Sequence, residues 1–150
     1  MKYPALIGLA VCGCVTSGSQ NIRPIAEEVI EASQRVLWTA SLRALTNQGL
    51  PLRFSDPDEG IIETEYVDIS QFQQAAAQYP SAERLVRFRF LLREDPEGEG
   101  TVLAVQGIYS PFRSGLSNTR RGERAVPRDH PAAGLIQRMV ADARKIAEGG

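Results

Sequence analysis

The sequence has little of what most catalytic and metal-binding sites need. Its 150 residues include only two cysteines and one histidine. His130 stands between Asp129 and Pro131, and no serine or cysteine in a recognisable nucleophile turn accompanies it. A catalytic triad therefore has no support, and we expect His130 to be a surface residue in front of a helix. We predict a protein that is not an enzyme, with no catalytic residues, no metal site and no cofactor.

The sequence also lacks a strong net charge and a long hydrophobic segment. Its 17 basic and 18 acidic residues leave a net charge of -1, which is too small for the field of a nucleic-acid-binding domain. No stretch of about 18 apolar residues occurs, so we predict no membrane-spanning helix. The one continuous apolar run, Ala5 to Val11, follows a single positive charge at Lys2. This order is typical of a secretory signal peptide, although a core strand is an alternative.

Both cysteines lie at the end of that apolar run, in Val11-Cys12-Gly13-Cys14. This stretch resembles the lipobox of bacterial lipoproteins, in which a small residue precedes a cysteine that is acylated and becomes the new N-terminus. Cys14 fits better than Cys12 because Gly13 is small and Val11 is bulky. The alternative is a redox or metal pair, but two cysteines and one histidine cannot complete a four-ligand zinc site. We predict a signal peptide over residues 1–13 and lipidation, including palmitate, at Cys14.

The lipid would determine where the protein resides. A multiply acylated cysteine holds a domain on a membrane almost permanently, because each buried methylene contributes about 0.8 kcal/mol. The residue directly after Cys14 is Val15. An aspartate at this position resembles an inner-membrane retention signal, and its absence favours the periplasmic face of the outer membrane. Residues 15–23 show no apolar periodicity, so residues 14–23 are predicted to form the lipidated cysteine and a flexible tether. A single domain should follow over residues 24–148.

The rest of the chain predicts an α+β domain. Helical periodicity indicates a helix from about residue 24 to 47 and a final helix after Pro131, and residues 70–83 suggest one or two helical turns. Four strands are predicted, at residues 50–55, 60–69, 84–94 and 101–110. Such strands form an antiparallel meander whose apolar face needs a cover, and the two helices supply it. We therefore predict two layers, with a four-stranded antiparallel sheet packed against the N-terminal and C-terminal helices.

The strand at residues 84–94 has the clearest alternation in the chain. Its apolar residues Val86, Phe88, Phe90 and Leu92 should face the core, and Arg87, Arg89 and Arg93 should face water. In the same way, Glu63 and Glu65 should lie on a solvated side of their strand. The acidic sequence at residues 56–60 is predicted to be a hairpin turn and not a calcium loop, because Val67 stands where such a loop needs a glutamate.

Two further features are candidates for binding. Arginines between residues 113 and 130 could contact an anionic group, such as a lipid phosphate, or the acidic segment 56–68, or they could belong to a solvated loop. The candidates for contact with an anionic group are Arg120, Arg121 and Arg124. Aromatic residues are expected in the core, although a ligand groove between helix and sheet would use the same ones. These residues are Trp38, Phe54, Tyr66, Phe88, Phe90 and Tyr109.

Several segments together resemble a known family. They are the long helix with its closing leucine and glycine, Phe54-Ser55-Asp56, residues 60–66 (GIIETEY), residues 87–90 (RFRF) and residues 101–105 (TVLAV). This combination is similar to the helix-grip domain of the BamC (NlpB) lipoproteins, accessory subunits of the outer-membrane β-barrel assembly machinery. The resemblance implies a helix-grip-like fold and a protein partner in outer-membrane protein assembly or envelope maintenance. The alternative function is a periplasmic module that binds lipid or a small ligand in a helix-sheet groove.

Overall fold

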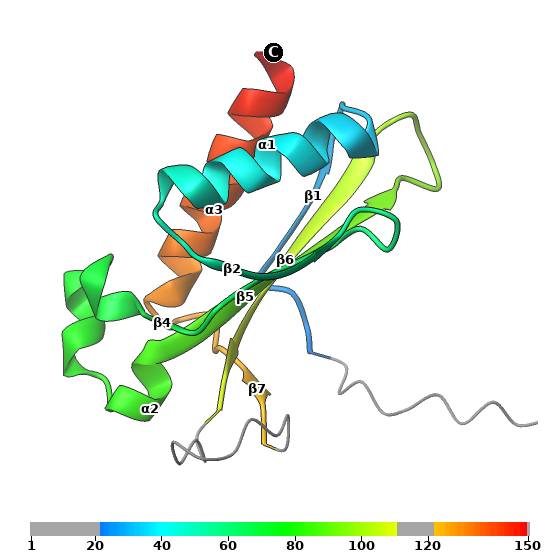
Figure 1. Cartoon of the computed structure of the whole chain (residues 1–150). Helices are drawn as coiled ribbons and strands as arrows, with labels where there is room; N and C mark the ends of the chain where they lie inside the picture. Colours follow the sequence, from blue (N-terminus) through cyan, green and yellow to red (C-terminus); the bar gives the residue numbers. More distant parts are fainter. Residues whose placement is uncertain (1–21, 111–121, 150) are drawn as a thin grey trace, which may run out of the picture.

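The computed structural model describes residues 22–110 and 122–149, which form an antiparallel sheet with two long helices on one face (Figure 1). The strands are β1 (Ala26–Ile30), β2 (Leu52–Asp56), β3 (Ile61–Thr64), β4 (Val67–Asp68), β5 (Leu85–Glu94), β6 (Thr101–Tyr109) and β7 (Arg124–Ala125). The helices are α1 (Gln34–Asn47), the short α2 (Ser81–Arg84) and α3 (Ala132–Glu148), with 3₁₀ turns at Ile69–Gln71 and Gln74–Gln78. The predicted α+β class, with an N-terminal and a C-terminal helix, is confirmed.

The sheet has seven strands, so the predicted count of four is too low. Its main path runs β1-β6-β5-β3-β2, while β4 continues the pairing along β5 and β7 pairs with β6. The four predicted strands correspond to β2, to β3 with β4, to β5 and to β6. The sequence pattern misses β1 and β7, and it does not separate β4 from β3. The two missed strands both pair with β6, from segments that are distant in the sequence.

The N-terminal helix begins later than predicted. Residues 26–30 form β1, which pairs antiparallel with β6, and α1 begins only at Gln34. Ser33 is the N-cap, since its hydroxyl accepts a hydrogen bond from the backbone N–H of Val36. The error has a physical reason. The apolar residues Ala26 and Ile30 are four apart, a spacing that puts two residues on one side of a helix and also on one side of a strand.

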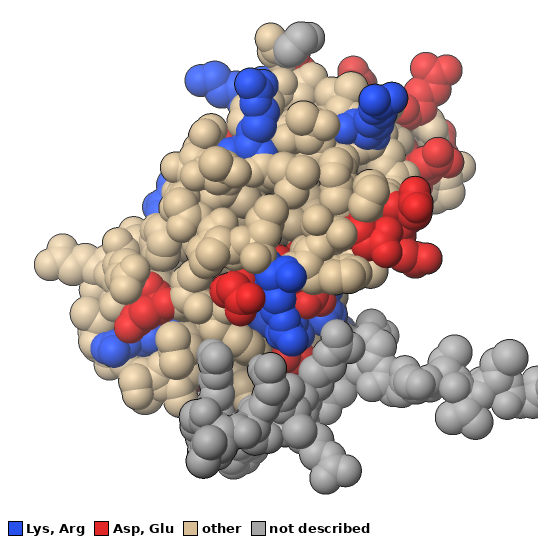
Figure 2. All heavy atoms as spheres, in the orientation of Figure 1, with Lys and Arg blue, Asp and Glu red and all other residues tan. Residues whose placement is uncertain are grey.

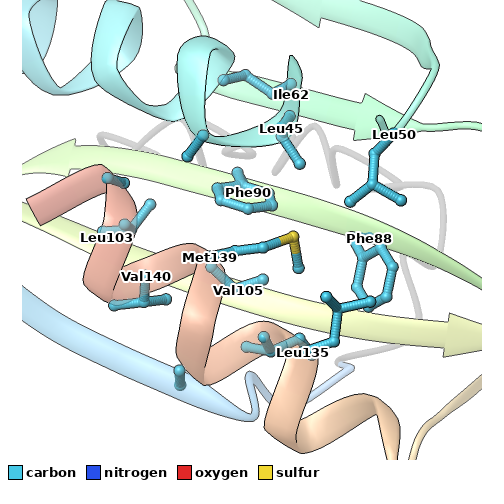
Figure 3. Close-up of a cluster of buried hydrophobic side chains, with 14 of the residues drawn as sticks. Leu45, Leu50, Ile62, Phe88, Phe90, Leu103, Val105, Leu135, Met139 and Val140 are labelled. Carbon is cyan, nitrogen blue, oxygen red and sulfur yellow. The ribbon is translucent and has the colours of Figure 1, made fainter. Parts of the chain in front are cut away.

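The space between the helices and the sheet is filled with apolar side chains (Figure 3). The predicted inward set on β5 is confirmed, because Val86, Phe88, Phe90 and Leu92 are all buried there. Helix α1 contributes Leu37 and Leu45 among others, and α3 contributes Leu135, Ile136, Met139 and Val140. Two of the aromatic residues predicted for the core lie elsewhere. Phe54 is 49% exposed, and Tyr66 lies on the opposite face of the sheet.

The predicted hairpin turn between β2 and β3 is confirmed. The Asp56 side chain accepts hydrogen bonds from the backbone N–H groups of Asp58 and Glu59, which closes the turn. Gly60 follows with a φ of +67°, and a Cβ at this position would lie 2.1 Å from the backbone oxygen of Leu92. Glycine is required here for two reasons, the left-handed backbone and the close approach of β5.

Candidate functional site

The face of the sheet opposite the long helices carries a row of polar side chains. Glu63 of β3, Arg89 of β5 and Gln106 of β6 are directly opposite one another in the strand register. Opposed residues of antiparallel strands point to the same side of the sheet, so the three side chains lie next to one another. Arg87, two residues before Arg89, belongs to the same face. We call this side the open face.

Arg87 lies at the centre of a buried charge cluster on the open face. Its guanidinium is fully buried and lies 2.7 Å from a carboxylate oxygen of Glu63 and 2.8 Å from the carboxylate of Glu123. Arg89 donates from Nε to the other oxygen of Glu63 at 2.6 Å. The Tyr66 hydroxyl donates to Glu123 at 3.0 Å, and the Arg87 guanidinium lies 5.7 Å from the Tyr66 ring centre. The five side chains form one connected network.

The predicted solvated sides of β3 and β5 are therefore partly wrong. Arg87 and Glu63 are buried, and Arg89 is largely covered, whereas Arg93 is exposed as predicted. The physical reason is charge pairing across strands. Arg87 and Arg89 each pair with a carboxylate, which compensates the cost of removing the arginine charge from water. Glu63 and Arg89 belong to separate strands, and only the register of β3 with β5 brings them together.

The open face also holds two other chain segments against the sheet. Gln106 donates a hydrogen bond to the backbone oxygen of Ile22, the first described residue. Glu123 stands just before β7 and meets Arg87 from that side. The sequence predicts Ile22 to lie in the flexible tether, yet its side chain is buried. The open face thus positions the chain where it enters the described domain.

Of the residues predicted for lipidation or for contact with an anionic group, the structure describes only Arg124. Cys14, Arg120 and Arg121 lie outside the described residues, as does nearly all of the predicted tether. Arg124 begins β7 opposite Tyr109, and its side chain is exposed. Within the acidic segment 56–68, Glu63 pairs with Arg87 of β5, which lies outside the arginine-rich segment.

His130 is the second candidate position, and the prediction of a surface histidine is wrong. Its side chain is only 5% exposed. The backbone of Ala132 donates a hydrogen bond to Nδ1 at 3.2 Å, and the Tyr79 ring lies edge-on at 4.7 Å between ring centres. The chain turns just before it, where the His130 N–H donates to the backbone oxygen of Pro127. This turn places the ring under the 70–83 insertion, which local sequence does not reveal.

A small pocket of about 200 Å³ opens beside His130. Its lining residues are Tyr79, Glu83, Tyr109, Pro127, Asp129 and His130. Burial lowers the pKa of His130 below its usual value, and the charge and backbone of Glu83, with the charge of Asp129, oppose this only in part. No set of three histidine, cysteine or acidic side chains suited to a metal ion exists among the described residues.

A third feature is the free edge of the sheet at β2. Leu52 and Phe54 are 45% and 49% exposed, which is unusual for large apolar residues on a strand. The strand pairs with β3 on one side only, and a bulge at Arg53 interrupts its register. Acidic side chains gather at the end of the sheet where the β2–β3 and β5–β6 turns lie (Figure 2).

No protein-family model matches the sequence, and no curated protein matches it either. Across residues 22–110 and 122–149, no helix is long and apolar enough to cross a membrane.

Proposed function

We propose that the protein is a non-enzymatic lipoprotein, anchored through Cys14 at the periplasmic face of the outer membrane, whose domain binds a protein partner. The anchor rests on the order of Lys2, the apolar run, Gly13 and Cys14. The resemblance to BamC-type helix-grip domains supports the partner role, and with it a role in outer-membrane protein assembly or envelope maintenance. An antiparallel sheet with α1 and α3 on one face is compatible with that fold.

The observation that carries the binding role is the exposed edge strand β2. Its outer backbone groups have no strand beside them in the described parts of the chain, and Leu52 and Phe54 offer apolar contacts on this edge. Proteins often bind an extended segment by adding it to such an edge. The neighbouring acidic turn, with Asp56, Asp58 and Glu59, favours a segment that combines apolar residues with lysine or arginine. We therefore infer that the partner contributes an extended, basic and apolar segment.

The alternative function, ligand binding in a groove between helix and sheet, gains no support. Phe88, Phe90, Met139 and Leu135 fill that space and are fully buried. A ligand would have to displace them, at a cost of several kcal/mol for the exposed apolar surface.

Site-specific photocrosslinking tests the binding role. The full-length lipidated protein would carry a photoreactive residue in place of Leu52, and the same residue in place of Arg35 serves as control. Arg35 is an exposed position on α1. We expect a discrete crosslinked protein from position 52 in isolated outer membranes, and none from position 35. The substitution Phe54→Asp should abolish this product while the protein stays folded, because half of the Phe54 side chain already faces solvent.

Products that are the same at both positions, or a product that survives Phe54→Asp, would contradict the assignment of β2. Identification of the product by mass spectrometry shows which segment was captured. The proposal requires an extended segment with at least one basic residue near the crosslinked site.

A further inference from the structure

The pocket at His130 combines features of a binding site that the proposed function does not use. It lies between the 70–83 insertion, the end of β6 and the turn before α3. Two aromatic rings, Tyr79 and Tyr109, contribute to its walls, together with the acidic residues Glu83 and Asp129. Such rings and carboxylates attract cations, the rings through their negative faces and the carboxylates through full charges.

The two carboxylates have no ion-pair partner in the described parts of the chain. Arg84 follows Glu83 directly in the sequence, but its guanidinium lies 3.4 Å from the Asp68 carboxylate and so is already paired. Arg128 is exposed and does not line the pocket. Two ionised carboxylates beside one small pocket repel each other, and a bound cation or water reduces this repulsion.

His130 is an independent indication of a ligand. Its side chain is 95% buried, and its Nε2 atom makes no hydrogen bond of normal geometry among the residues that the structure describes, although the backbone of Glu83 lies near the ring. Because Ala132 donates to Nδ1, the neutral ring carries its proton on Nε2 and can donate it. A buried donor without a partner is costly, and an oxygen acceptor on a ligand in the pocket would satisfy it.

We propose that this pocket binds the ammonium group of a small organic amine that carries an oxygen acceptor close to its nitrogen. Glu83 and Asp129 hold the ammonium group, Tyr79 and Tyr109 flank it, and His130 donates to the oxygen. A neutral His130 ring does not repel the cation. The volume of about 200 Å³ limits the ligand to a few heavy atoms or to the end of a longer molecule.

Two sources offer this chemistry, a free amine and the amino terminus of a peptide. In a peptide terminus, one carbon separates the ammonium group from a carbonyl group. An amino-acid amide is a free amine with the same arrangement. The probes are therefore glycinamide for the free amine and triglycine amide for the peptide terminus. N-acetylglycinamide keeps the carbonyl and removes the charge, so it serves as the matched control ligand.

The sole histidine makes the test direct, because its ring signals in an NMR spectrum report on the pocket without assignment of other residues. With the full chain, we expect glycinamide or triglycine amide to shift the His130 ring signals in a saturable way and N-acetylglycinamide to leave them in place. Tighter binding of triglycine amide indicates a peptide terminus, and binding of glycinamide alone indicates a free amine.

Variants separate the site from a general effect of charge. Glu83→Gln and Asp129→Asn should each weaken binding about three- to fivefold, the range expected for partly exposed charge pairs. Glu97→Gln, which changes an exposed acid on the distant β5–β6 turn, should leave binding unchanged. Equal shifts with the acetylated control, or no shift with either amine, would overturn the proposal. These outcomes are independent of the crosslinking at β2.

Discussion

Arg87 shows how much a single side chain can depend on its neighbours. It is one of three arginines that alternate with the apolar residues of β5, a pattern that predicts all three to be solvated. The alternation is real, since Arg87 and Arg89 do point away from the helices. Burial does not follow from it, because burial depends on Glu63, Tyr66 and Glu123, which are distant in the sequence. The one signal in the sequence is the acidic residue of β3, Glu63, in a strand that pairs with the arginine-bearing β5.

Arg87→Met should destabilise the protein strongly. The substitution leaves Glu63 and Glu123 buried beside each other without the charge between them, and loss of one member of a buried pair costs about 3–5 kcal/mol. Arg93→Met serves as control, because the Arg93–Glu27 pair is exposed at 3.4 Å and should contribute at most about 1 kcal/mol. Urea unfolding followed by circular dichroism measures both. Equal losses in the two variants would show that the cluster is not a buried network.

His130 gives the stability a defined pH dependence. Burial lowers its pKa in the folded state below the ordinary 6.5. As the pH falls through about 6.5, the unfolded chain therefore takes up the proton first, and the free energy of unfolding decreases. The His130 contribution is fully present above this pH and is lost as the pH falls toward the folded pKa. Glu83 and Asp129 face the ring and limit the size of the effect.

Urea unfolding at about pH 7.5 and about pH 5.5 measures this dependence. We expect lower stability at the acidic pH for the natural chain, and a smaller difference for His130→Gln. An NMR titration of the ring provides a second readout, with a folded-state pKa below 6.5. A ring that titrates at or above 6.5 in the folded chain would contradict the prediction.

At the scale of secondary structure elements, the sequence predicts the strands with clear alternation and the helices with apolar stripes. β5, β6 and α3 agree closely with their predicted ranges. The residues of β1 fit the periodicity of the first helix as well as that of a strand, and only pairing with β6 decides between them. β7 has two residues, too few for any pattern. The missing strands are those whose stability comes from long-range pairing and not from local propensity.

The β2–β3 hairpin offers a test of an element, because the chain has two glycines with similar backbone angles. Gly60 (φ +67°) lies against Leu92 of β5, while Gly49 (φ +71°), after α1, has open space where a Cβ would lie. Gly49→Ala should cost about 1 kcal/mol from its backbone angle alone. Gly60→Ala should cost at least about 1 kcal/mol more, because the new methyl group pushes away the strand that donates the Leu92 N–H to Gly60.

Chemical denaturation of the two glycine variants against the natural chain gives the comparison. If the two substitutions cost the same, β5 does not approach Gly60 as closely as the structure places it. The difference in the free energy of unfolding between the two variants is therefore more informative than either value alone.

At the scale of the whole molecule, the two faces of the sheet differ in what covers them. The helices cover one face of the sheet, and the open face receives the chain at Ile22, eight positions after Cys14. Neither the anchor nor the identity of a partner follows from the arrangement of strands and helices. Both rest on short sequence patterns and on exposed residues.

Metabolic labelling with a palmitate analogue tests the anchor, on which the whole account depends. The natural full-length protein should incorporate the label and fractionate with the outer membrane. Cys12→Ser should do the same, because Gly13 and Cys14 remain, whereas Cys14→Ser should lose the label entirely. Label that persists in Cys14→Ser, or protein recovered from the cytosol with residues 1–13 still attached, would contradict the account.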